Sequence, residues 1–140
     1  MAALGFTFRF RESGGSPTIL DLLFKDTETL TKGDLVNLET GEIDLLATGD
    51  TNALGVVLET KAGTDSTTRA KVIVDVDAVY GIYDANARLL GAPLDVAGAT
   101  GAQTVAASSN KEFIVARESS ATEETLVKFN VGKHAFNKAQ

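Results

Sequence analysis

The side chains that could do nucleophilic or acid–base chemistry in this chain are few and scattered. His134 is the only histidine, and it lies in a polar stretch near the end of the sequence. A Ser-His-Asp triad needs a histidine that is held by packing and by a neighbouring acid. We therefore expect His134 to be exposed to solvent rather than catalytic.

Asp75 and Asp77 are the best candidates for a working pair of carboxylates. They alternate with Val72, Val74 and Val76, so on a continuous strand both acids would project from one face. Such a pair can bind Ca²⁺ or divide acid and base work. No further acids follow at the spacing of a metal-binding loop. We interpret the valines as core residues and the aspartates as surface charges.

Two other stretches match chemical motifs only in part. Asp50-Thr51-Asn52 has asparagine where the Asp-Thr-Gly of aspartic proteases has glycine, and it lacks the apolar flanks of that motif. The stretch 98–104 has the glycines of a phosphate-binding loop, but it has no lysine and no helix is expected after it. We assign no catalytic residue, no metal ligand and no cofactor.

Composition excludes several classes of partner. The chain has 13 basic and 19 acidic residues and a net charge of −6, so it repels a phosphate backbone and no nucleic-acid partner is expected. It has no cysteine, which leaves no disulfide or Cys-based zinc site. Only Tyr80 and Tyr83 could stack on a sugar ring, since there is no tryptophan. No signal-peptide pattern or membrane-length apolar run is present, so we expect synthesis in a cytoplasm and no membrane contact.

Short apolar runs separated by turns predict a mainly β fold, a compact β-barrel or β-sandwich. The run 19–26 fits either a strand or a helix face, and its short length favours a strand. One short helix is expected over 85–90, with Asp84 as its N-cap and Gly91 after its end. The other strands are expected at 35–38, 43–46, 53–59, 69–80, 93–96, 104–107, 113–117 and 124–131.

The N-terminal segment has two interpretations. Residues 6–11 alternate phenylalanine with polar or cationic side chains, and the stretch 12–17 that follows is rich in glycine and serine. The segment is either a half-buried edge strand of the domain or an arm that pairs with a partner protein. With the second interpretation, the chain is divided into a flexible arm over 1–16, a β-rich domain over 17–132 and a polar tail over 133–140.

A faint internal similarity is also present. Gly-x-x-Val-x-Leu over 33–38 is similar to Gly-x-x-Leu-x-Val over 91–96, and Thr-Gly pairs follow at 40–41 and 100–101. Two related hairpin-plus-strand units would explain it. The matches involve common residue types, so they support a barrel or sandwich without establishing a duplication.

The order of these parts resembles a known family. The stretch GDLVNLETGEIDLLATGDTNALGVVLE is followed by the valine-rich KVIVDVDAVYGIYD, then by GAPLDV and TVAASSNKEFIVARE. This pattern, over residues 30–131, is similar to the small capsid decoration (cement) proteins of tailed bacteriophages. The most telling pieces are the Gly-Asp-apolar-Val turn at 33–36 and Ala-Leu-Gly-Val at 53–56.

The resemblance implies a non-enzymatic structural protein on the outer surface of an assembled capsid, made in the bacterial host cytoplasm. Such proteins sit as homotrimers at threefold or quasi-threefold positions, bind the major capsid protein and clamp neighbouring capsomers. The arm would order on the capsid as an added strand. Its candidate capsid-binding residues are Phe6, Phe8, Arg9, Phe10 and Arg11.

Two other functions stay open on the sequence. One is a β-barrel enzyme that uses Asp75 and Asp77 in an acidic cleft. The other is a receptor- or sugar-binding module with an acidic surface site. The enzyme predicts a concave pocket whose acids have displaced pKa values, whereas the binding module predicts exposed aromatic platforms.

Overall fold

The computed structural model describes residues 5–25, 28–47, 52–63, 68–107, 113–121, 123–130 and 134–137. These residues form short strands and one 3₁₀ turn, η2 (Ala135–Asn137). None of their helical segments has the length and apolarity needed to cross a membrane. The strands are β1 (Thr7–Arg11), β2 (Ile19–Leu23), β3 (Thr29–Leu30), β4 (Leu35–Glu39), β5 (Glu42–Leu45), β6 (Ala53–Val57), β7 (Lys61–Ala62), β8 (Arg69–Ile73), β9 (Ala78–Asp84), β10 (Pro93–Ala97), β11 (Thr104–Ala107), β12 (Phe113–Arg117) and β13 (Glu123–Phe129).

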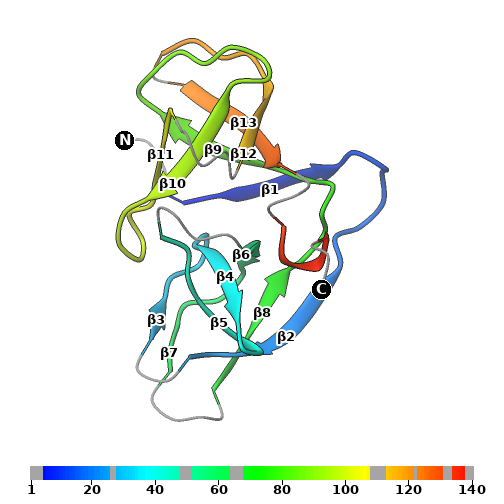
Figure 1. Ribbon diagram of the computed structural model, residues 1–140, viewed down its shortest axis with the longest axis vertical. Coiled ribbons are helices and arrows are strands. Elements are labelled where there is room, and N and C mark those ends of the chain that lie inside the picture. The colour runs from blue at the N-terminus through cyan, green and yellow to red at the C-terminus, as the bar shows by residue number, and fades with distance from the viewer. Residues whose placement is uncertain are drawn as a thin grey trace.

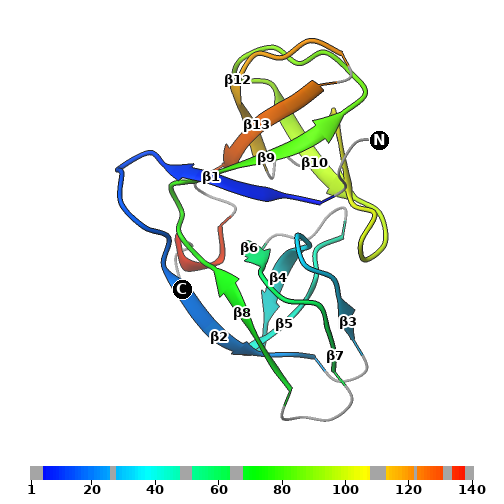
Figure 2. The ribbon, with the colours of Figure 1, turned by 180° about the vertical axis from the view of Figure 1, so that it is seen from behind.

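Two antiparallel sheets make up the molecule. One has the strand order β2-β8-β6-β4-β5 and the other the order β1-β9-β13-β12-β10-β11, while β3 and β7 form a small separate pair. Figure 1 shows them as a lower half (β2 to β8) and an upper half (β9 to β13) that follow each other along the long axis, with β1 crossing at the base of the upper half. Seen from behind, the arrangement is the same (Figure 2). The fold is therefore mainly β and sandwich-like, as predicted, and in the described residues neither sheet closes into a full barrel.

The two halves repeat one topology. In the lower half a hairpin (β5-β4) is followed by β6, β8 and β2 across the sheet, and in the upper half β11-β10 is followed by β12, β13 and β9. All of these neighbours are antiparallel. The order of the strands along the chain also agrees between the halves: β2 of the lower half corresponds to β9 of the upper half, and β8 corresponds to β13. The upper half differs in having β1 as an added edge strand.

The repeat extends to the register of individual residues. Val36 pairs with Gly55 in the lower half, and Leu94 pairs with Phe113 at the same spacing in the upper half. Further across the sheets, Val57↔Val72 and Leu20↔Val72 correspond to Val115↔Val127 and Tyr80↔Val127. A matched register over several strands is much stronger evidence for a structural repeat than similar residue types are. The faint sequence similarity therefore reflects a repeated fold.

The glycine that begins the sequence motif in each half makes the same backbone hydrogen bond. Gly33 donates to Val57 O at 2.9 Å, and Gly91 donates to Val115 O at 2.9 Å. Both glycines have positive φ, at 94° and 82°, which other residues adopt only with strain. The sequence motif therefore records a turn that requires glycine.

A buried carboxylate joins the two halves. Asp34 follows the first of these glycines and is 1% exposed. It accepts hydrogen bonds from the Thr31 N–H at 2.8 Å, the Thr100 hydroxyl at 2.5 Å and the Gly101 N–H at 2.8 Å. Gln103 adds three more bonds, to the N–H and carbonyl of Leu35 and to the Leu46 carbonyl. These bonds fix the β10–β11 turn of the upper half on the lower half.

The central strand of the lower sheet, β6, is buried on both faces. One apolar cluster lies inside the lower half and includes Phe24, Leu54 and Val72. A larger cluster contains upper-half residues such as Phe113 together with Val56 and other residues from the opposite face of the lower sheet. Burial on both faces explains why β6 reads as an unbroken apolar run rather than an alternating one.

The predicted helix over 85–90 is wrong. Strand β9 continues to Asp84, which pairs with Glu123, and the Arg88 backbone exchanges two 3.0 Å hydrogen bonds with Ser119. The capping bond does form, from the Asn86 N–H to the Asp84 carboxylate at 3.0 Å. The backbone beyond it is held by a distant segment, so no helical ladder develops.

The single strand predicted over 69–80 is also wrong, because the chain turns at residues 76–77 between β8 and β9. Consequently β8 belongs to the lower sheet and β9 to the upper sheet. In this structure the N-terminal segment is an edge strand of the domain: β1 pairs with β9, with a bulge between Phe8 and Phe10.

Candidate functional site

The phenylalanines of the N-terminal segment differ in their surroundings. Phe6 is 3% exposed and stacks on Phe113 with ring centroids 5.9 Å apart. Phe8 is half-buried and meets the Tyr80 ring edge-on at 6.2 Å. Phe10 is 47% exposed. Of the three, only Phe10 presents a large free apolar surface to a partner.

The two arginines of β1 are held by ion pairs within the chain. Arg9, in the bulge, binds Glu124 through two nitrogens. Arg11 donates to Asp77 at 2.9 Å. Burial alone would raise the pKa of Asp77, but hydrogen bonds from Ser13 and from Arg11 outweigh it and lower that pKa to about 2. The Asp77 carboxylate is thus ionised at neutral pH and fastens the N-terminal segment to the turn between the sheets.

Asp75 and Asp77 are both engaged by the N-terminal segment. Asp75 is 7% exposed, so the prediction that it is a surface charge is wrong. It accepts the Thr18 N–H at 2.6 Å and lies 3.6 Å from the Arg11 guanidinium. Both acids thus hold the segment 11–18 against the turn between the sheets.

His134 is fully buried, so the prediction that it is exposed is wrong as well. Its ring packs edge-on against Phe129, with centroids 4.6 Å apart. Nδ1 accepts the Phe136 N–H at 3.1 Å, which leaves Nε2 to donate to the Leu54 carbonyl at 2.7 Å. Burial lowers the pKa of His134. The ring is a neutral structural bridge between the C-terminal segment and β6.

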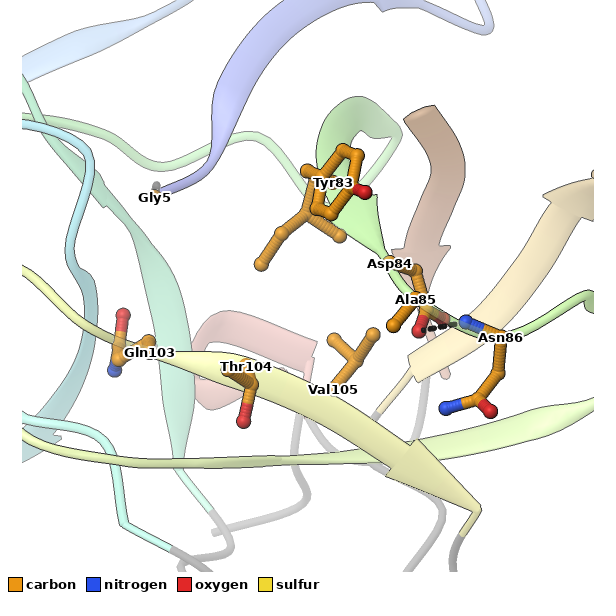
Figure 3. Close-up of a pocket in the computed structure, with 9 residues that line it drawn as sticks. Gly5, Tyr83, Asp84, Ala85, Asn86, Gln103, Thr104 and Val105 are labelled. Carbon is orange, nitrogen blue, oxygen red and sulfur yellow. Dashed lines mark hydrogen bonds between the residues drawn. The ribbon is translucent and has the colours of Figure 1, made fainter. Parts of the chain in front are cut away.

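A pocket of about 410 Å³ opens between β9 and β11 (Figure 3). Figure 3 shows Tyr83 and Val105 on opposite sides of it, with Gly5 at its margin. Asp84 lies in its wall. The lining residues are Gly5, Ile82, Tyr83, Asp84, Ala85, Asn86, Gln103, Thr104 and Val105.

The residues that line the pocket do not form a recognisable catalytic constellation. Its one charged group, Asp84, is neutralised by Arg88 at 2.5 Å, and Arg88 also donates to the Val105 carbonyl at 3.4 Å. The Gln103 amide is committed to the lower half. No histidine, cysteine or lysine is among the lining residues. An apolar floor with neutral polar groups at its margin suits an apolar side chain better than a reactive substrate.

The repeat explains why this pocket exists. In the lower half the corresponding seam lies between β2 and β5, where Phe24 bridges to Ile43 and is fully buried. In the upper half Asp84 and Val105 hold the corresponding places, and the ion pair of Asp84 with Arg88 takes the place of the packed ring. Sequence reasoning missed this site, because residues 85–90 were predicted to form a helix with Asp84 as its N-cap.

No group of three or more histidine, cysteine, aspartate or glutamate side chains that could hold a metal ion occurs in the described part of the chain. The stretch 50–52, which partly matches the protease motif, lies outside the described residues except for Asn52. In the glycine-rich stretch 98–104, the turn is followed by β11, and Thr100 and Gly101 are bonded to Asp34. It is a structural turn.

No family model matches the chain, and no curated protein matches it. Among solved structures, it is similar to the crystal structure of the head fiber gp8.5 N base in bacteriophage phi29. The TM-score is 0.53 at 11% sequence identity, over 81% of this chain and 95% of that chain. The likeness is one of fold.

A match over 81% of the chain includes strands from both halves, because neither half contains that share of the residues. The shared fold is therefore the two-half arrangement rather than one sheet of it.

Proposed function

We propose that the protein is a non-enzymatic structural component of a bacteriophage head. The observation that carries the proposal is the fold shared with a head fiber base over 95% of that base. The sequence pattern supports it independently, since it resembles that of capsid decoration proteins. The two acids that could have supported an enzyme, Asp75 and Asp77, are engaged in holding the N-terminal segment.

In the finer form of the proposal, the protein binds the outer surface of the assembled capsid as a homotrimer. It contacts the major capsid protein and stabilises the shell by clamping neighbouring capsomers. Stabilisation then requires added interface area and no turnover, and many weak contacts on one particle act together. The same assignment implies a location on the virion surface.

Within the N-terminal segment, Phe10 is the residue best suited to contact the capsid. Its ring is 47% exposed, whereas Phe6 belongs to the core and Arg9 and Arg11 have partners in the chain. Deleting residues 1–16 would also strip β1 from β9 and uncover Tyr80. A substitution at Phe10 therefore tests capsid binding more cleanly than a truncation does.

The test uses purified protein and DNA-filled heads of a parent phage that lack it. We expect saturable co-sedimentation at a fixed number of copies per head and survival of the decorated heads at a higher temperature. Failure of the wild-type protein to bind any such head would count against the capsid assignment.

Phe10→Ala and Phe136→Ala are a matched pair for the contribution of the N-terminal segment, because Phe136 is exposed to a similar degree, 51%, but belongs to η2 rather than to β1. We expect Phe10→Ala to weaken binding to heads about tenfold, as for an interface aromatic. Phe136→Ala should bind as the wild type does. Equal binding by both variants would remove Phe10 from the interface while leaving the capsid assignment intact.

A further inference from the structure

The open edge of β2 differs sharply from the corresponding edge of β9. In the upper half, β1 covers β9 and pairs Phe8 with Tyr80 and Phe10 with Val79. Tyr80 and Val79 are 0% and 1% exposed. No described strand covers β2, which ends its sheet.

The matched register identifies which residues of β2 lack a cover. Leu20 pairs with Val72 as Tyr80 pairs with Val127, so Leu20 and Ile19 hold the places of Tyr80 and Val79. Ile19 is 45% exposed and Leu20 is 37% exposed. Two large apolar side chains are thus exposed at the two positions that β1 buries in the sister sheet.

Backbone groups on this edge are also available. The Thr18 carbonyl accepts from Val74, and the Phe24 N–H donates to Thr68, so even-numbered residues of this strand face β8. By the alternation of an antiparallel ladder, Ile19 and Asp21 turn their N–H groups outward. Of the outward carbonyls, that of Asp21 is bonded by the Arg69 side chain at 3.2 Å.

We propose that the edge of β2 from Thr18 to Asp21 is a strand-acceptor site that binds a short extended segment of a partner protein. β1 indicates the chemistry of that segment: an antiparallel strand whose large apolar side chains alternate with polar ones. The segment is short, because the edge closes onto β5 at the bridge between Phe24 and Ile43.

A second copy of this chain fits the edge less well. Pairing two β2 strands in full register, through their outward-facing residues, sets Asp21 opposite Asp21, and like charges directly opposite each other are destabilising. Donating β1 to another copy would uncover Tyr80 and Val79 in the donor. The partner is therefore a different polypeptide, and this inference stands independently of the capsid assignment.

The test uses the full-length ¹⁵N-labelled protein and, as probe, a synthetic peptide with the sequence of residues 5–12, GFTFRFRE. We expect the amide resonances of Ile19 and Asp21 to shift in a saturable way and their hydrogen exchange to slow. Shifts confined to Val79 and Gly81 would mean that the peptide only displaces β1, and that result would overturn the proposal. So would the absence of any shift at Ile19 and Asp21 up to millimolar peptide.

Ile19→Lys and Leu89→Lys are the matched variants. Both place a lysine at an exposed apolar position, since Leu89 is 76% exposed, but only the first places it on the β2 edge, where lysine blocks strand addition. We expect at least about tenfold weaker peptide binding for Ile19→Lys and unchanged binding for Leu89→Lys, with equal melting temperatures. Equal loss in both variants would contradict the proposal. Concentration-dependent dimers of the wild type that Ile19→Lys abolishes would also contradict it, in favour of a second copy.

Discussion

At the scale of single residues, buried polar side chains hold this chain together across long sequence separations. Asp34 fixes the upper half to the lower half, and Asp75 and Asp77 fix the segment that leads from β1 to β2. His134 attaches the C-terminal segment to β6. Asp34, Asp75 and His134 are buried and Asp77 is half-buried. Buried polar groups are stable when their hydrogen bonds are made, and these residues make theirs with partners from other segments.

His134 should make stability depend on pH in a defined window. It is the only histidine, and burial lowers its pKa in the folded chain, with Asp75 as the nearby charge that opposes the shift. Below the unfolded pKa of about 6.5, the unfolded chain takes up the proton more readily, so the free energy of unfolding falls as the pH falls. We expect a loss of up to about 1.4 kcal/mol per pH unit below that value.

Urea unfolding at pH 7, 6 and 5 measures this dependence, with His134→Gln as the comparison. The variant should be less stable at pH 7 but should lose less stability between pH 7 and 5 than the wild type. Parallel pH dependence in the two proteins would show that His134 does not titrate on unfolding.

At the scale of elements, β6 is the most constrained strand of the lower half. All five of its residues are buried, because one face packs in the lower cluster and the other against the upper half. Gly55 in its middle lies against the backbone of β8: a Cβ at this position would be 1.5 Å from the Ile73 carbonyl oxygen. The glycine in Ala-Leu-Gly-Val is therefore required by the close approach of two strands.

Gly55→Ala should destabilise the protein by more than about 3 kcal/mol, because two backbone segments would have to separate. Gly14→Ala provides the contrast, since φ there is +81° but nothing lies within 4 Å of the added carbon. Its expected cost is only about 1 kcal/mol, from backbone strain. Chemical denaturation of both variants measures the difference, and similar values would show that the sheet accommodates the methyl group.

At the scale of the whole molecule, the two repeats contact each other unequally. The first-repeat turn, residues 31–34, meets the second-repeat hairpin turn, residues 98–101. The equivalent second-repeat turn carries Leu89 and Leu90, which are 76% and 70% exposed. The halves are therefore stacked head to tail and are not related by a twofold axis, so their free ends differ in chemistry.

Asp34 should determine whether the two halves unfold together. Asp34→Ala leaves the half-buried donors Thr100 and Gly101 without their acceptor, and the expected cost is about 2 to 3 kcal/mol. Both tyrosines lie in β9, so tyrosine fluorescence reports on the upper half, whereas far-ultraviolet circular dichroism reports on all strands. In the wild type the two transitions should coincide, and in Asp34→Ala the fluorescence transition should separate from the other.

Asp21→Ala is the control for this change, because it removes an exposed aspartate from β2. Its two transitions should stay coincident and its stability should be close to that of the wild type. Coincident transitions in Asp34→Ala as well would show that apolar packing alone couples the halves.

The sequence by itself determined the strands whose signal is local. Strands were predicted at 35–38 and 43–46, on either side of the Thr-Gly pair at 40–41, and both residues of that pair have positive φ in the structure. The class of the fold followed from alternation and from turn residues. The similarity of 33–38 to 91–96 also indicated a repeat, although residue types alone were too common to establish one.

Tertiary structure decided which local patterns were used. The chain 69–80 has strand propensity throughout, yet it turns at residues 76–77, because β8 and β9 belong to different sheets. Asp84 has the spacing of a helix cap, yet Ser119 holds the backbone of Arg88. His134, the seam pocket and the open edge of β2 all depend on residues that are distant in the chain. A local pattern records the propensity of a segment, but burial and pairing depend on which distant segment packs against it.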